Sequence, residues 1–315
     1  MSISRPRTRS LASRPSAAGG EQRIGRDLIA ESLNRAVTRP VVAIVGVGLI
    51  GGSLGMALRR RGYRVVGIGR RKSSLANAKR AGAVDSTSLR LSDAAEADLV
   101  ILAAPVADIV RLAETLFPRL KRGTLVTDVG SVKGSVMRKL VPLARKYRLR
   151  FAGSHPLAGS HRTGVNAARR DLFHKSACVV VPGTSGAITP IAAFWRSVGA
   201  HPIRLTAKTH DAALALTSHL PHLIAHALVQ TVARRSDRRQ LTRLMAGSFR
   251  DVTRVASADP EQWSQIFSQN AVDVRRASAL FSRELRRLSG QIGRSGLQAT
   301  LRRSQSFRQP LFNGI

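Results

Sequence analysis

Three glycines at a fixed spacing are the first residues with a recognisable chemistry. Gly46, Gly48 and Gly51 follow a short apolar run and precede helix-forming residues. In a strand–turn–helix unit the first glycine permits a tight turn, the second lets a pyrophosphate approach the backbone, and the third lets helix and strand pack closely. The N–H groups at the helix start, from Leu49 and Ile50 on, then face the anion. The spacing predicts a dinucleotide site.

Two other interpretations of this segment stay open. It could be an ordinary buried turn between a strand and a helix. It could also be a membrane segment, because residues 41–58 carry no charge over roughly the length of a membrane span. The glycines and the three arginines at 59–61 count against a span.

The end of the second apolar run, residues 63–68, indicates which dinucleotide binds. In such folds an acidic residue at this point usually accepts the ribose 2′-hydroxyl. Here Gly69 stands at that position, and Arg70 and Arg71 follow it. A carboxylate would repel a 2′-phosphate, whereas a guanidinium binds it through two charge-assisted hydrogen bonds. We therefore predict NADP, with NAD as the alternative if the two arginines are ordinary surface charges.

Two candidate chemical side chains follow later strands. Ser131 lies in residues 127–133 and His155 in residues 153–160, and each segment comes after an apolar run. Ligands of open α/β sheets bind at the carboxyl ends of the strands, so both side chains are expected near one crevice. Pro105 closes another strand at this edge, and we assign it to the cofactor site. Ser131 and His155 could otherwise be loop-capping residues.

The elements that position these residues alternate between strand and helix patterns. Apolar runs predict strands at 41–45, 63–68, 97–103, 124–128, 150–153, 178–181 and 201–205. Helical spacing fills the segments between them, at 106–120, 133–147 and 189–198 among others. This alternation indicates an α/β fold with a doubly wound, Rossmann-type, mostly parallel sheet.

After residue 205 the pattern becomes helical. Helical periodicity covers 209–235, 238–245 and 259–288, with few strand signals. We predict four parts: a disordered basic tail at 1–38, a dinucleotide-binding domain at 39–206, an all-helical domain at 207–290 and a frayed tail at 291–315.

The composition narrows the class of protein. The net charge of +34 permits nucleic-acid binding, but the basic residues are dispersed and aromatic residues make up 4%, so such binding is disfavoured. Cys178 is the single cysteine, which excludes a disulfide framework and a cysteine-based zinc site. We expect a cytoplasmic protein. The absence of acidic residues from 1–20 resembles a transit peptide, so organellar targeting is the alternative.

Five further segments carry a resemblance to a known family. They are TDVGSVK at 127–133, GSHPLAG at 153–159, SHLPH at 218–222, FRDVTR at 249–254 and DPxxW at 259–263. From about residue 41 to residue 288 the chain resembles the prephenate/arogenate dehydrogenase family of tyrosine biosynthesis. Each motif alone is weak, but the set in this order is specific. The resemblance implies a helical domain that forms a homodimer and an active site between the two domains. We expect no membrane association.

Carried over residue by residue, the resemblance makes His155 the catalytic histidine and Ser131 its hydroxyl partner. Arg254 would bind the substrate carboxylate. The substrate pocket would be lined by His219, His222 and Trp263. The reaction implied is oxidation of a carboxylated cyclohexadienol: a hydride goes to the nicotinamide, a base takes the hydroxyl proton, and loss of CO2 makes the ring aromatic. A histidine suits the base because its ordinary pKa is near neutrality.

The substrate and the reaction class each have an alternative. The resemblance implies conversion of prephenate to 4-hydroxyphenylpyruvate, or of arogenate to tyrosine. The segment after GSHPLAG, residues 160–162, holds no acid that would favour the ammonium of arogenate. Another two-domain β-hydroxyacid dehydrogenase is a more distant alternative, although those families usually carry a lysine in the first interdomain helix and 209–232 has none.

Three histidines of the first interdomain helix could form a metal site. His219, His222 and His226 fall at helical spacing on one face, but no carboxylate or cysteine flanks them closely. We predict no metal.

Overall fold

One eight-stranded sheet forms the centre of the N-terminal domain, with the strand order β3-β2-β1-β4-β5-β6-β7-β8. The computed structural model describes residues 39–159 and 162–312, so the predicted basic tail at 1–38 lies outside the described residues. The strands are β1 Val41–Val45, β2 Arg64–Ile68, β3 Ser86–Ser88, β4 Leu99–Leu102, β5 Leu125–Asp128, β6 Arg150–Pro156, β7 Ala177–Val181 and β8 His201–Arg204. Neighbouring strands pair in parallel except β6 and β7.

The order of the sheet creates a crevice beside β1. The chain builds β1, β2 and β3 outward, then crosses to β4 on the other side of β1. Ligands of such sheets bind at this switch point, outside the carboxyl ends of the strands. The glycine turn that follows β1 lies at that point. The predicted doubly wound fold is confirmed.

Helices cover both faces of the sheet, and each face has its own core. The helices are α2 Leu49–Arg60, α3 Lys72–Arg80, α4 Val106–Leu116, α5 Gly134–Lys146 and α6 Ile188–Ser197, with short 3-10 turns η1 Leu91–Ala94, η2 Phe117–Arg119 and η3 Val165–Ala167. The core of one face includes Ile44, Leu54 and Trp195, and the core of the other face includes Ile109 and Leu140. Alternate residues of a strand supply the two faces, which explains why β1, β4 and β7 consist of apolar residues.

The largest departures from the predicted strands are at β3 and β6. β3 was not predicted, because it has no apolar residue and forms only a short edge pairing with β2. β6 continues to Pro156, beyond the predicted end at residue 153. The extension pairs antiparallel with β7, where His155 lies opposite Val179. His155 is therefore part of a strand rather than of the loop after it, and the sheet holds its backbone.

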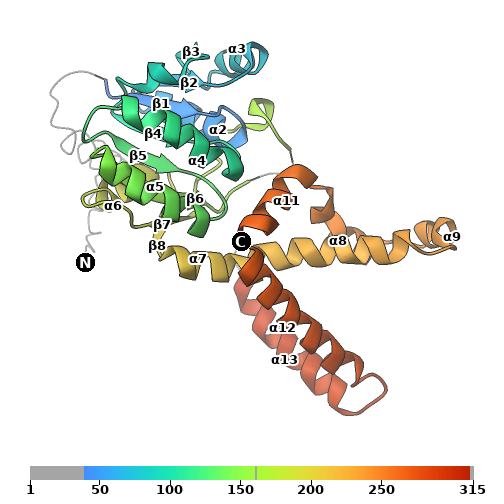
Figure 1. Ribbon diagram of the computed structural model, residues 1–315. Coiled ribbons are helices and arrows are strands. Elements are labelled where there is room, and N and C mark those ends of the chain that lie inside the picture. The colour runs from blue at the N-terminus through green and yellow to red at the C-terminus, as the bar shows by residue number, and fades with distance from the viewer. Residues whose placement is uncertain (1–38, 160–161, 313–315) are drawn as a thin grey trace, which may run out of the picture.

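The described part of the C-terminal domain is all-helical, as predicted, and its helices project from the α/β domain (Figure 1). They are α7 Ala207–Leu214, α8 Leu220–Ala233, α9 Arg238–Arg243, α10 Gly247–Thr253, α11 Pro260–Gln269, α12 Ala271–Ser289 and α13 Gly296–Phe312. A π-helical turn, η4 Ala215–His219, joins α7 to α8, and a 3-10 turn, η5 Arg254–Ser257, follows α10.

The predicted frayed tail after residue 290 is wrong for residues 296–312, which form α13. Most side chains of this helix are exposed, so it has no continuous apolar face to mark it in the sequence. Its alanine, leucine, glutamine and arginine residues have high intrinsic helix propensity, which favours a helix without a buried face.

The C-terminal domain buries little of its own apolar surface. Its small core joins Ala215 and Leu220 to Val274 and Ala277. By length and composition alone, the continuous helix Ala207–Ala233 could cross a membrane. Core helices of soluble proteins pass the same test, and here α7 packs on α5 while α8 packs on α12.

Candidate active site

The glycine turn is shaped by backbone contacts that exclude side chains. Gly46 has φ +99°, and a Cβ there would lie 2.4 Å from the carbonyl oxygen of Ala103. A Cβ on Gly51 would lie 2.1 Å from the carbonyl oxygen of Gly46. At Gly48 a Cβ would meet nothing within 4 Å. The first and third glycines are therefore required by packing, whereas the second leaves open space in front of the backbone.

A pocket of about 290 Å³ lies over this turn. It is lined by Gly46, Val47, Gly48, Gly69, Arg70, Arg71, Ser74, Asn77, Thr163, Gly164, Val165 and Asn166. Arg70 is 79% exposed and its guanidinium lies 3.7 Å from the carboxylate of Asp108. The lining residues include two arginines and no acid, which fits an anionic dinucleotide.

The other predicted cofactor residues, Leu49, Ile50, Gly51 and Pro105, are not among the residues that line this pocket. Leu49 and Ile50 are the first residues of α2, so their N–H groups have no acceptor within the helix. Pro105 is the residue before α4, beyond the carboxyl end of β4. Both positions belong to the crevice edge of the sheet.

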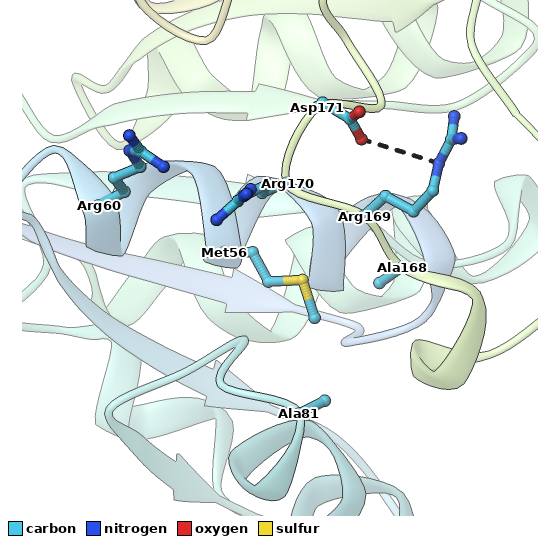
Figure 2. Close-up of a pocket in the computed structure, with 7 residues that line it drawn as sticks. All are labelled: Met56, Arg60, Ala81, Ala168, Arg169, Arg170 and Asp171. Atoms are coloured by element: carbon cyan, nitrogen blue, oxygen red, sulfur yellow. Dashed lines mark ion pairs between the residues drawn. The ribbon is translucent and has the colours of Figure 1, made fainter.

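A second, more open pocket of about 670 Å³ lies at the opposite end of α2. In Figure 2, Met56 and Arg60 of α2 and Ala168 to Asp171 surround it, and Arg169 pairs with Asp171 at 3.8 Å. The pocket is basic, but it is distant from the carboxyl ends of the strands and includes no histidine. We do not assign it to the catalytic site.

A chain of hydrogen bonds connects His155 to the C-terminal domain. His155 Nδ1 lies 2.8 Å from His210 Nε2, and His210 Nδ1 lies 2.7 Å from Asp211 Oδ1. The carboxylate of Asp211 also accepts the backbone N–H of Lys133 at 2.8 Å and of Gly134 at 2.7 Å. His210 is fully buried. The first helix after the domain boundary thus contacts both the strand of His155 and the start of α5.

A buried ion pair stabilises the loop that carries Ser131. The ammonium of Lys133 contacts the carboxylate of Asp128 and the carbonyl oxygen of Ser154, the latter at 2.8 Å. Asp128 also accepts the N–H of Gly130 at 2.8 Å. Ser131 itself is partly buried. It lies beside the strand of His155 because β5 and β6 are adjacent and parallel.

The remaining predicted pocket residues form a cluster of rings. His222 stacks on Trp263 with centroids 3.4 Å apart, and His219 meets the same indole edge-on at 6.0 Å. Asn270 Nδ2 donates to the carbonyl oxygen of Asp211 at 2.9 Å and lies 3.2 Å from His219 Nδ1. Asn270 therefore connects the ring cluster to Asp211, the last residue of the hydrogen-bonded series that begins at His155. The π-helical turn that ends at His219 is a type of distortion that is frequent at functional sites.

Two histidines of the site, His155 and His219, have lowered pKa values that favour their neutral forms. Burial, followed by the nearby His210, Lys133 and His219, lowers the pKa of His155 well below its ordinary value of 6.5. Burial is also the main reason that the pKa of His219 falls to about 4. A neutral imidazole can accept a proton, so His155 has the charge state that a general base requires.

His222 and Arg254 lie close enough to interact electrically. Burial lowers the pKa of His222 to about 4, and the positive charge of Arg254 contributes to the shift. Arg254 is exposed at the start of η5, which packs on α8. Within residues 39–159 and 162–312 it makes no ion pair, so its guanidinium is available for a carboxylate of a ligand.

The sequence analysis missed His210, Asp211 and Asn270. The signal that could have marked the first two is a pair of adjacent titratable residues near the start of the first interdomain helix, where the helix meets the crevice. For Asn270, no pattern in the neighbouring sequence indicates a functional role. In the described ranges, no group of three or more His, Cys, Asp or Glu side chains is arranged to hold a metal.

Comparisons with family models match both halves of the chain. The prephenate dehydrogenase nucleotide-binding domain matches residues 54–204, and the prephenate dehydrogenase dimerization domain matches residues 206–303.

Curated relatives and solved structures agree with these models. A cyclohexadienyl dehydrogenase of Zymomonas mobilis is 39% identical over 56% of this chain and 61% of its own length. A prephenate dehydrogenase of Bacillus subtilis is 35% identical over 57% of this chain and 50% of its own. The chain thus spans about half to three fifths of the length of these curated relatives.

Among solved structures, prephenate dehydrogenase from A. aeolicus, in complex with hydroxyphenyl propionate and NAD+, superposes with a TM-score of 0.81. It is 30% identical, and the match covers 88% of this chain and 100% of that one. Synechocystis arogenate dehydrogenase has a TM-score of 0.73 at 30% identity, over 86% of this chain and 99% of that chain. A 3-hydroxyisobutyrate dehydrogenase of Salmonella typhimurium, 15% identical with a TM-score of 0.56, shares the fold alone.

Proposed function

Since the chain belongs to the prephenate dehydrogenase family, we propose that it catalyses the oxidative decarboxylation of prephenate to 4-hydroxyphenylpyruvate. One observation carries the proposal: a neutral imidazole, His155, is held at the carboxyl edge of the same sheet that presents the glycine turn. Oxidation of an alcohol requires a hydride acceptor and a base, and this edge of the sheet offers a site for each.

In the proposed reaction each polar residue has one task. His155 takes the proton of the substrate hydroxyl, and Ser131 hydrogen-bonds that hydroxyl or orients the imidazole. Arg254 binds the ring carboxylate through its planar fork until this group leaves as CO2. The pocket walls are formed by His219, His222 and Trp263. When bound, the nicotinamide supplies the hydride acceptor.

We propose that the cofactor is NADP. Its pyrophosphate would lie on Gly48 and the free N–H groups of α2, with Arg70 and Arg71 near the 2′-phosphate. This choice is supported by the two arginines and the absence of an acid in the pocket lining. NAD is the alternative, and the A. aeolicus relative was solved with NAD+. Steady-state KM values for both cofactors test the choice, and a lower KM for NAD would overturn it.

The substrate is tested by mixing the protein with prephenate or arogenate and each cofactor. Absorbance of the reduced nicotinamide reports turnover. A higher kcat/KM for prephenate is expected, whereas a preference for arogenate assigns the alternative. Absence of turnover on either compound contradicts the proposed function.

We further propose a cytoplasmic homodimer formed through the helical domain. Apolar side chains are exposed on this domain, among them Val272, Leu280 and Leu285 of α12. The matching family model is a dimerization domain. Sedimentation at the mass of two chains is expected, and a monomer at micromolar concentration would contradict the dimer.

A further inference from the structure

We propose that His210 and Asp211 are positioning residues that fix the tautomer of His155, so that its Nε2 meets the substrate hydroxyl without a proton. This inference rests on the proposed function, in which His155 is the base. It concerns His210, which contacts His155, and Asp211, which contacts His210.

The direction of each hydrogen bond follows from the carboxylate of Asp211, which is the last group in the series of hydrogen bonds. An ionised carboxylate only accepts, so Asp211 Oδ1 receives the Nδ1–H of His210 at 2.7 Å. In the proposed arrangement His210 carries one ring proton, the one that it donates to Asp211, so its Nε2 is the acceptor in its 2.8 Å contact with His155. Nδ1 of His155 is therefore the donor. Its Nε2 is left with a free lone pair, as in a catalytic triad whose acid orients the histidine.

Hydrogen bonds hold the carboxylate of Asp211 in a fixed orientation. Both of its oxygens accept backbone N–H groups, at Lys133 and Gly134, where α5 begins. The carbonyl oxygen of the same residue accepts the amide of Asn270. Although burial raises the pKa of Asp211, hydrogen bonds from His210 and from the two N–H groups lower it overall. Asp211 therefore stays an acceptor at neutral pH.

In the proposed reaction the hydrogen bonds through His210 to Asp211 also stabilise the imidazolium of His155 that forms when it takes the proton. Once His155 holds the proton from the hydroxyl, its Nδ1–H still donates to His210, whose other N–H points at a carboxylate. The groups that face His155 are His210 from α7, Lys133 before α5, His219 from η4 and the Cys178 thiol from β7. Burial, His210, Lys133 and His219 all oppose the imidazolium, in that order. In the proposed arrangement the charge-assisted hydrogen bond from Nδ1–H to an unprotonated Nε2 of His210 offsets part of this cost.

A histidine proton–nitrogen correlation spectrum of the isotope-labelled full-length protein tests the tautomer directly. At about pH 7.5, above the ordinary pKa of histidine, the signal assigned to His155 by comparison with His155→Asn should show the Nδ1–H form. An Nε2–H form in the unmodified protein overturns the proposal. This reading requires no substrate, so it is independent of whether the proposed reaction is correct.

Kinetics of substituted proteins test the consequence. His210→Phe keeps a ring but removes the acceptor, and we expect kcat to fall about a hundredfold while the substrate KM changes by less than about threefold. His210→Gln keeps an acceptor oxygen and should lose only about tenfold in kcat. The control is His201→Gln, an exposed histidine of the edge strand β8, with unchanged kcat.

The outcomes separate the possible failures. If the unmodified protein turns over prephenate and folded His210→Phe and His210→Gln both keep its kcat, the positioning role is wrong and the proposed function stands. If no dienol is oxidised but the Nδ1–H form is observed, the proposed function fails and the tautomer assignment stands. Should His210→Phe not fold, the kcat of His210→Gln and the tautomer in that variant decide.

Discussion

The glycine turn and the His155 network lie at the same edge of the sheet but are constructed in opposite ways. At the turn, backbone atoms define the shape, and Gly46 and Gly51 have no space for a Cβ. Around His155, side chains from β6 and α7 reach the start of α5 through polar atoms 2.7 to 2.8 Å apart. The turn depends on the absence of side chains, and the network depends on the proton positions of side chains that are present.

Because of this difference, the two regions tolerate different substitutions. Any side chain at a required glycine disturbs the turn, whatever its charge. In the network, a side chain of similar volume can preserve the fold and still change the chemistry. Substitutions in the turn should therefore act on folding and cofactor affinity, and substitutions in the network on kcat, on KM and on the response to pH.

The largest effect is expected from Gly51→Val. Its Cβ would lie 2.1 Å from a backbone oxygen that has no room to move, so Tm should fall and cofactor binding should be lost. Gly48→Ala is the matched control, because nothing lies within 4 Å of that Cβ; Tm should stay and only the cofactor Kd should rise. Thermal melting and cofactor titration measure both. A Tm for Gly51→Val equal to that of the unmodified protein would show that the turn is not set by packing.

The second largest effect is expected from a substitution of His155 in the hydrogen-bond network. His155→Asn removes the base but leaves the glycine turn intact, so kcat should fall by about a hundredfold or more while the cofactor Kd stays constant. Steady-state kinetics and cofactor titration separate the two quantities. An unchanged kcat would remove His155 from the reaction.

Arg254→Gln should change substrate binding more than the chemical step. Loss of charge-assisted hydrogen bonds to a carboxylate is worth about 1.5–3 kcal/mol, which corresponds to a rise in KM of about tenfold or more. Arg250→Gln is the control on the preceding helix, since Arg250 is exposed and lies 3.6 Å from the carboxylate of Asp251. Equal KM values for the two variants would reject the carboxylate role.

The smallest effect concerns stability and pH. The pKa of His219 in the folded protein is about 4, below its ordinary 6.5, so the unfolded chain binds a proton first as pH falls. The stability from this neutral imidazole is complete above pH 6.5 and is lost as pH falls from there toward 4. Tm should therefore decrease between about pH 7.5 and 5.5, and His219→Gln should reduce that decrease. An identical pH dependence in both proteins would exclude His219 as a cause.

Local patterns in the sequence were sufficient to predict the glycine turn and most strands of the sheet. Gly46 and Gly51 are adjacent in sequence to the strand and helix that they join, so spacing alone identifies their task. The ring cluster of His219, His222 and Trp263 was identified through the family resemblance, and the structure brings these side chains together.

Features that depend on distant pairing could not be predicted in the same way. His155 lies within β6 because β7, which begins at Ala177, pairs back on it. The contact between His155 and His210 joins residues 55 positions apart across the domain boundary. Helix α13 escaped prediction because nearly all of it is exposed, and periodicity reports only faces that are buried.

Asp211 also has a mechanical consequence. It belongs to the first helix of one domain, yet its two oxygens cap the start of α5 in the other. Pulling the domains apart at this point would expose a carboxylate and two N–H groups that satisfy one another, whereas a rotation about it would leave those bonds intact. A rotation of the domains about this contact would therefore keep the base beside its hydrogen-bond partners, whereas a translation would separate them.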